Sequence, residues 1–139
     1  MKTVKGNGRN ALMIAAEKGN TDVVKLLIAH PSGVEQAKMV AKNGWNALMI
    51  AAENGRTEVV KYFIAHTSGT QQAKMVNKDG INALMIAAAH NRTEVVKLLI
   101  DHPSGTEQAK MVDVFGKNAL MIANENGHQA IVDLLAPLM

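Results

Sequence analysis

Apolar residues recur along this chain in clusters that return every 36 residues. The segment Asn-Ala-Leu-Met-Ile-Ala begins at four positions, namely Asn10, Asn46, Asn82 and Asn118. A period in this range predicts stacked supersecondary units, each too small to bury its own apolar face. We therefore divide the chain into the units 5–40, 41–76, 77–112 and a shortened 113–139.

Each unit is predicted to begin a first helix at its asparagine. The asparagine side chain can accept hydrogen bonds from free amides at a helix start, and residues 47–54 of the second unit are mostly good helix formers. A glycine or asparagine, which best adopts the left-handed conformation just past a helix end, follows at one equivalent position. These residues are Gly19, Gly55, Asn91 and Gly127. The first helix should end there.

A second helix is predicted directly after this residue. Threonines that can cap it stand at Thr21, Thr57 and Thr93, each followed by an acid where the helix dipole favours negative charge. The run 59–64 is apolar on most faces, so this helix should lie inside the array. Tyr62 and Phe63 replace leucines in this run, and we expect both side chains in the core.

A third, short helix is predicted between units, because Pro31 breaks the second helix and helical signals then restart. A serine followed three residues later by an acid or amide fits a capping box. The pairs are Ser32 with Glu35, Ser68 with Gln71, and Ser104 with Glu107. The predicted ranges are 33–39, 69–75 and 105–111. A tight turn should follow, because Asn43-Gly44 and Asp79-Gly80 are favoured turn pairs.

The second unit combines a turn glycine, Ala-Leu, Ala-Ala, a helix-ending glycine, Val-Val and an apolar pair. These are Gly44, Ala47-Leu48, Ala51-Ala52, Gly55, Val59-Val60 and Phe63-Ile64. This pattern resembles the ankyrin repeat, and its four copies cover nearly the whole chain. The resemblance implies an all-α solenoid of helix-turn-helix units, a single repeat domain over residues 1–139. It also implies a non-catalytic protein that binds another protein on its concave face.

Two features depart from the ankyrin pattern. Asn-Ala-Leu-Met replaces the family's Thr-Pro-Leu-His, so the threonine to histidine hydrogen bond cannot form, and the methionines should supply adaptable packing. The unit has 36 residues instead of the usual 33. The excess falls in the third helix, where an ankyrin repeat has its β-hairpin finger. We therefore expect an extra short helix between units and a shortened or absent finger.

The charge balance raises the possibility of a polyanion partner. The net charge is +3 and the pI is about 9.3. Two lysine ladders could bind nucleic acid, namely Lys25, Lys61, Lys97 and Lys38, Lys74, Lys110. Acidic residues stand three positions before most of these lysines, as Glu58 does before Lys61 and Glu107 before Lys110, which predicts local pairing. We therefore rank nucleic-acid binding below protein binding.

Composition also restricts the compartment and the chemistry. The chain lacks cysteine, which excludes disulfides, thiol nucleophiles and thiolate metal ligands. No apolar run approaches the ~20 residues of a membrane span, and the first residues lack the apolar segment of a secretory signal. We expect a cytoplasmic monomer with no membrane partner.

Candidate chemistry is sparse. His30, His66 and His102 form a ladder, but stacked helices about 8 to 10 Å apart hold such residues too far from one zinc ion. We interpret them as residues beside the C-terminal carbonyls of the second helices. No nucleophile joined to a base and no glycine-rich phosphate loop is recognisable. We predict no catalytic residue, no metal site and no cofactor.

The positions where the units differ carry the functional signal. Units two and three are identical at 25 of 36 positions, and six of the 11 differences lie in the turn before the first helix or at its end. In an ankyrin-like stack both segments edge the concave surface. Large apolar groups in these turns indicate an interface. The predicted partner-binding residues are Arg9, Lys18, Asn43, Trp45, Asn54, Asp79, Ile81, His90, Phe115 and Lys117.

Alternatives stay open for these positions. The differences can reflect drift at tolerant surface sites, with Trp45 or Phe115 folded back onto a neighbouring unit. Near-identical units also fit a structural or engineered consensus-like scaffold with no evolved ligand, and a recently duplicated natural array would look similar. Polar substitutions in the first and last units predict end caps and an array complete at four units. The apolar closing residues 134–139 leave truncation open.

Overall fold

The computed structural model describes residues 9–30, 39–41, 43–65 and 69–139. The first helices of the four units are α1 (Ala11–Lys18), α4 (Ala47–Glu53), α7 (Ala83–Ala89) and α10 (Ala119–Glu125). The second helices are α2 (Thr21–Ala29), α5 (Thr57–Ala65), α8 (Thr93–Asp101) and α11 (Gln129–Leu135). Two short helices, α6 (Gly69–Lys74) and α9 (Gly105–Lys110), lie between units, and the 3-10 helix η1 (Ala136–Leu138) follows α11.

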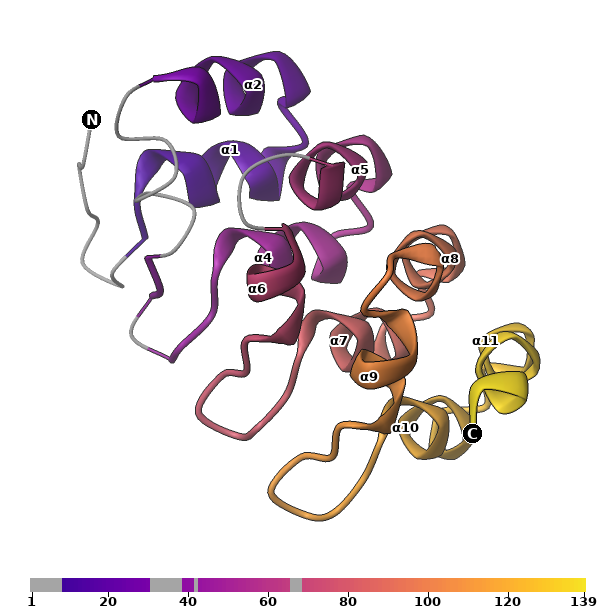
Figure 1. Ribbon diagram of the computed structural model, residues 1–139. Helices are drawn as coiled ribbons and strands as arrows, with labels where there is room; N and C mark the ends of the chain where they lie inside the picture. The colour runs from indigo at the N-terminus through magenta and orange to yellow at the C-terminus, as the bar shows by residue number, and fades with distance from the viewer. Residues whose placement is uncertain (1–8, 31–38, 42, 66–68) are drawn as a thin grey trace.

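These helices stack in two rows (Figure 1). Each first helix contacts the first helix of the next unit, and each second helix contacts the second helix of the next unit. No strand is assigned within the described ranges. The all-α repeat solenoid predicted from the sequence is therefore confirmed.

The asparagines begin the first helices as predicted. The Asn46 Oδ1 atom accepts the backbone N–H of Met49 at 2.8 Å, and the other three asparagines do the same at 2.9 Å. Asn46 also donates from Nδ2 to the carbonyl of Gln72 in α6, at 3.3 Å. The side chain that starts the first helix thus also ties the short third helix to it.

The left-handed residues end the first helices as predicted. Gly19, Gly55 and Gly127 have φ angles of 72°, 67° and 73°. Asn91 takes this position in the third unit with φ of 58°, the one positive value of a non-glycine residue in the described part of the chain. Asparagine is among the residues that tolerate this conformation best, which explains the substitution.

The prediction that threonines cap the second helices is wrong. Thr21, Thr57 and Thr93 are the first helical residues, and no side-chain cap is recorded for α2 or α8. The Thr57 hydroxyl instead donates to the carbonyl of Gly55 at 3.4 Å. The tight turn after the left-handed residue starts the helix one position earlier than cap propensity alone predicted.

The third helices of the second and third units confirm two of the three predicted ranges. Residues 31–38, which contain most of the predicted helix 33–39, lie outside the described residues, as does Ser68. The predicted serine cap of α9 is wrong, because no side-chain cap is recorded at Ser104. Its hydroxyl instead lies 2.9 Å from Nδ1 of His102 and accepts Nε2 of Gln108 at 2.9 Å. The buried hydroxyl therefore bonds to these two side chains instead of to a backbone amide of α9.

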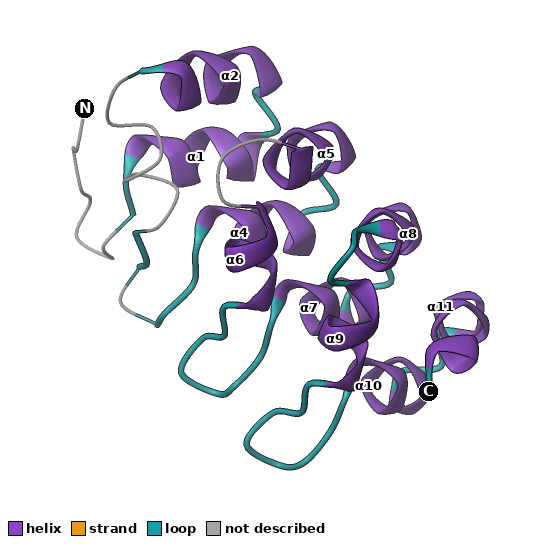
Figure 2. Cartoon of the chain, viewed as in Figure 1, coloured by secondary structure: helices purple, strands orange, loops and turns teal. Residues whose placement is uncertain are grey.

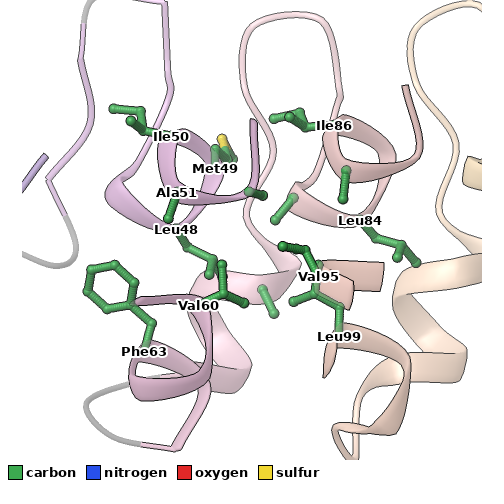
Figure 3. Close-up of a cluster of buried hydrophobic side chains, with 14 of the residues drawn as sticks. Leu48, Met49, Ile50, Ala51, Val60, Phe63, Leu84, Ile86, Val95 and Leu99 are labelled. Carbon is green, nitrogen blue, oxygen red and sulfur yellow. The ribbon is translucent and has the colours of Figure 1, made fainter. Parts of the chain in front are cut away.

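Core side chains come from facing surfaces of the two rows. In Figure 3, Leu48 of α4 and Val60 of α5 point toward one another between their helices, and both are fully buried. Phe63 is fully buried, as predicted. Tyr62 is only half-buried, which corrects the prediction for it, and its ring lies 5.7 Å from Nζ of Lys25. The first three Asn-Ala-Leu-Met methionines are fully buried, as adaptable packing requires.

Each finger is reduced to a closing turn. We call residues 41–45, 77–81 and 113–117 the second, third and fourth fingers; residue 42 is not described. In the third finger the Asn77 N–H donates to the Ile81 carbonyl at 2.9 Å, and the Gly80 N–H donates to the Asn77 carbonyl at 3.0 Å. The fourth finger repeats both bonds. The loops project beyond the helices (Figure 2), without the strands of a β-hairpin.

A further set of bonds joins successive units at the opposite end from the fingers. Nε of Arg56 donates to the Glu17 carbonyl at 2.8 Å, and Nε of Arg92 donates to the Glu53 carbonyl at 2.9 Å. At the last junction the equivalent residue is His128, whose Nδ1 lies 2.8 Å from the Ala88 carbonyl oxygen. The residue before a second helix therefore reaches back to the end of the preceding first helix.

Candidate protein-binding surface

In the two outer units, the side chain before the asparagine lies along the surface of the first helix. In the first unit, Arg9 pairs with Glu17 at 2.9 Å. In the fourth unit, Lys117 pairs with Glu125 at 2.8 Å. Each pair spans eight residues, from the turn to the end of the helix. Equivalent positions in the inner units hold Trp45 with Glu53, and Ile81 with Ala89.

The ion pair in the fourth unit raises the pKa of its lysine. The hydrogen bond that Lys117 donates to Glu125 raises the pKa of Lys117 above its ordinary value, and the negative charges of Glu125 and Asp113 act in the same direction. Desolvation opposes the shift. Because the pair is exposed to solvent, its contribution to stability is small.

The inner units place apolar side chains where the outer units have ion pairs. Trp45 and Ile81 are half-buried and pack against the hydrophobic core. Each therefore supports its own unit while leaving part of its surface accessible. We call Arg9, Glu17, Trp45, Glu53, Ile81, Ala89, Lys117 and Glu125 the helix strip.

Residues at the ends of the first helices border this strip. Lys18 and His90 are exposed, and Nε2 of His90 lies 3.6 Å from the Glu53 carboxylate. Asn54 is half-buried and donates from Nδ2 to the Ile50 carbonyl at 2.8 Å. Its amide already helps to end α4, so less of its hydrogen-bonding capacity is left for a partner.

The three predicted binding residues at the third position of the fingers differ in their hydrogen bonds and exposure. Oδ1 of Asn43 accepts the Trp45 N–H at 3.1 Å, which orders the turn beside the tryptophan. Asp79 is exposed at the equivalent position of the third finger. Phe115, at the same position of the fourth finger, is 80% exposed. It does not fold back onto a neighbouring unit, which removes one of the alternatives considered for it.

Sequence reasoning missed several links between units. Lys74 pairs with Glu107 of the next unit at 2.7 Å, whereas the sequence predicted Lys110 as the partner of Glu107. The predicted pair of Glu94 and Lys97 is present at 3.6 Å. A usable signal existed for the arginine links, because Arg56 and Arg92 follow the helix-ending residues Gly55 and Asn91 at one repeat position.

The histidine ladder behaves as a set of helix ends in the described residues. His30 and His102 are the C-cap residues of α2 and α8, while His66 lies outside the described residues. No group of three or more histidine, aspartate or glutamate residues suited to a metal ion occurs within the described ranges. In that same part of the chain, no helix is both long and apolar enough to cross a membrane.

Comparison with known proteins agrees with this geometry. The family model for ankyrin repeats (three copies) matches residues 1–72 and 68–138. No curated protein matches the chain. Ankyrin repeats are generally protein–protein interaction modules, and the family is typically non-catalytic. With nearly its whole length matched, and with paired helices stacked in register, this chain belongs to the ankyrin repeat family.

Proposed function

We propose that this chain binds a protein partner across the helix strip, without catalysing a reaction. The observation that carries the proposal is the change of chemistry along the strip. Half-buried apolar groups, Trp45 and Ile81, occupy the two inner units, and ion pairs occupy the two outer units. An apolar centre with a polar rim is the usual anatomy of a protein interface.

The mechanism is recognition by a preformed surface. Trp45 and Ile81 are held against the core, and Asn43 orders the turn before Trp45, so few side chains must be immobilised on binding. A low ordering cost favours affinity. The pairing of Arg9 and Lys117 with acids supports a neutral rather than a polyanionic partner surface.

A selection experiment tests the proposal. A display library of small protein domains is selected against the wild-type chain, and each recovered binder is measured against Trp45→Ala/Ile81→Ala and against Tyr62→Ala. Tyr62 is the matched control, because it is a half-buried aromatic residue on the other row of helices. We expect most binders to weaken by tenfold or more on the double variant alone, as for hot-spot residues (~2 kcal/mol).

Folding must be separated from binding in this test. Trp45 and Ile81 also pack against the core, so thermal unfolding is recorded for every variant. Glu53→Arg changes the strip at a partly exposed side chain that is not part of the core. Binders that respond to neither Glu53→Arg nor the double variant would refute the proposal. A library that yields no binder would support the alternative that the chain is a scaffold without an evolved ligand.

A further inference from the structure

Successive fingers form a ladder of backbone hydrogen bonds. The Lys78 N–H of the third finger donates to the Asn43 carbonyl of the second finger at 3.1 Å. The Val114 N–H of the fourth finger donates to the Asp79 carbonyl of the third finger at 3.0 Å. The third residue of each finger thus accepts a bond from the second residue of the next finger.

The covering finger also lies directly against the glycine of the finger that it covers. A Cβ atom on Gly44 would stand 3.1 Å from Cα of Asn77, and a Cβ atom on Gly80 would stand 3.2 Å from the Val114 nitrogen. The surface that a finger offers therefore accepts another backbone segment at close range.

Within the described residues, the fourth finger has this same surface without a cover. The Phe115 carbonyl stands at the repeat position of the Asn43 and Asp79 carbonyls. Nothing lies within 4 Å of the Cβ position on Gly116. Figure 2 shows the loop before α10 at the end of the row of loops.

The open finger is already rigid. Oδ1 of Asp113 accepts the N–H groups of Phe115 and Lys117 at 2.9 and 3.0 Å. The Asp113 N–H donates to the Lys117 carbonyl at 2.9 Å, and its carbonyl accepts the Gly116 N–H at 3.0 Å. A ligand would pay little to order this edge.

The side chains at this edge change from polar to apolar. The second and third fingers carry Lys-Asn and Lys-Asp where the fourth finger carries Val114 and Phe115. These two side chains are 63% and 80% exposed. Met121 is 47% exposed, although its three repeat equivalents are fully buried. Large exposed apolar groups at an open backbone edge, with a further one exposed in the first turn of the following helix, indicate a binding site.

The helix row at the same end disfavours a complete further unit. Asn124 replaces an alanine that is fully buried at the equivalent positions Ala16, Ala52 and Ala88. A unit or a second copy that packed in the repeat mode would have to bury this larger, polar side chain. A short segment that covers only the finger avoids that cost.

We propose that the edge of the fourth finger, residues 113–117, binds a short apolar peptide segment of a partner protein. The segment continues the finger ladder by donating a backbone N–H to the Phe115 carbonyl, and its side chains cover Val114, Phe115 and Met121. Peptides that add to an exposed backbone edge gain affinity from main-chain bonds and specificity from neighbouring side chains. This site meets the helix strip only at Lys117.

A titration with a defined peptide tests this proposal. The probe is an acetylated, amidated peptide with the sequence of residues 111–118, because that segment already covers the third finger. Nuclear magnetic resonance follows its binding to the ¹⁵N-labelled chain. We expect saturable shifts at the amides of residues 114–117 and Met121. Phe115→Ala should weaken binding about tenfold or more.

Two controls distinguish the ladder from general stickiness. A peptide N-methylated at the valine that corresponds to Val114 lacks the donor and should bind about 2- to 10-fold more weakly. Leu26→Ala removes a leucine that is 73% exposed on α2, at the other end of the array, and should not change binding. The proposal is overturned if Leu26→Ala weakens binding as much as Phe115→Ala.

Other outcomes also decide against the proposal. Shifts confined to the helix strip would assign the peptide to that surface. Absence of saturable shifts up to the solubility limit would show that the edge does not bind such a segment. If dilution of the chain alone shifts residues 114–117 and sedimentation equilibrium shows a dimer, a second copy occupies the edge instead.

Discussion

The third and fourth units contain the same Asn-Ala-Leu-Met-Ile-Ala segment in different surroundings. Met85 is fully buried between neighbours, whereas Met121 is 47% exposed. Asn82 caps α7 and also donates to the Gln108 carbonyl in α9, at 3.2 Å. Asn118 caps α10, and no bond from it to a third helix occurs within the described residues. Identical residues thus contribute differently, because much of a repeat's stability resides in its junctions.

Two residues change together from one junction between units to the next. Gly55 leaves room for Arg92, whose Cδ would lie 3.1 Å from a Cβ atom at that position. At the next junction Asn91 replaces the glycine, and the shorter His128 replaces the arginine. Both arrangements complete a bond to a carbonyl near the end of the preceding first helix. The helix-ending residue therefore determines how large a side chain the next unit can place over it.

The largest predicted effect separates the third and fourth units. Asn82→Ala should lower the free energy of unfolding by about 2 to 4 kcal/mol, because it removes a helix cap and leaves the Gln108 carbonyl without its donor. Asn118→Ala removes only a cap and should cost about 1 kcal/mol. Urea unfolding measures both values.

Serine at the same two positions isolates the contribution of the bond to the third helix. It keeps a cap acceptor and lacks the amide donor, so Asn82→Ser should still destabilise while Asn118→Ser should be nearly neutral. Equal losses at the two positions would show that the bond to α9 contributes nothing.

A smaller effect tests the pairing of glycine with arginine. Gly55→Asn should cost about 1 to 2 kcal/mol, because the new side chain displaces Arg92. Adding Arg92→His, which reproduces the last junction, should recover at least about 0.5 kcal/mol in a double-mutant cycle. Gly127→Asn is the matched control. It has a similar φ angle and no atom within 4 Å, so a loss as large as that of Gly55→Asn would contradict this explanation.

The smallest effect concerns the charged pair of the fourth unit, whose equivalents in the third unit are apolar. Glu125→Gln should lower the pKa of Lys117 toward its ordinary value, which titration of its Nζ signal measures. Because the folded state raises this pKa, the pair stabilises the chain below the unfolded-state pKa and loses that contribution as pH rises through the folded-state value. The stability change should be small, because the pair is exposed to solvent. An unchanged Lys117 pKa would rule out Glu125 as the cause.

Local features of the fold were predictable from the chain. The asparagine caps and left-handed helix ends follow from side-chain reach and backbone preference within a few residues. The short third helix at Gly105–Lys110 was predicted because its helical signals are also local. The cap at Ser104 was not, since the competing partners His102 and Gln108 meet the hydroxyl only in the folded chain.

The candidate surfaces were predictable only in part. Sequence comparison of the units identified Trp45, Ile81 and Phe115 as the unusual residues, because each interrupts a repeated pattern. It could not distinguish the two that pack against the core from the one that stays exposed. Nor could it pair Lys74 with Glu107, because that contact depends on how neighbouring units stack.

By itself, the sequence determined the period, the register and the ends of the first helices, since these depend on interactions within one unit. Only the tertiary structure decided which apolar residues stay exposed, which charges pair and which finger edge is left open. Those properties arise from the distances between units, and identical segments acquire them differently according to their place in the stack.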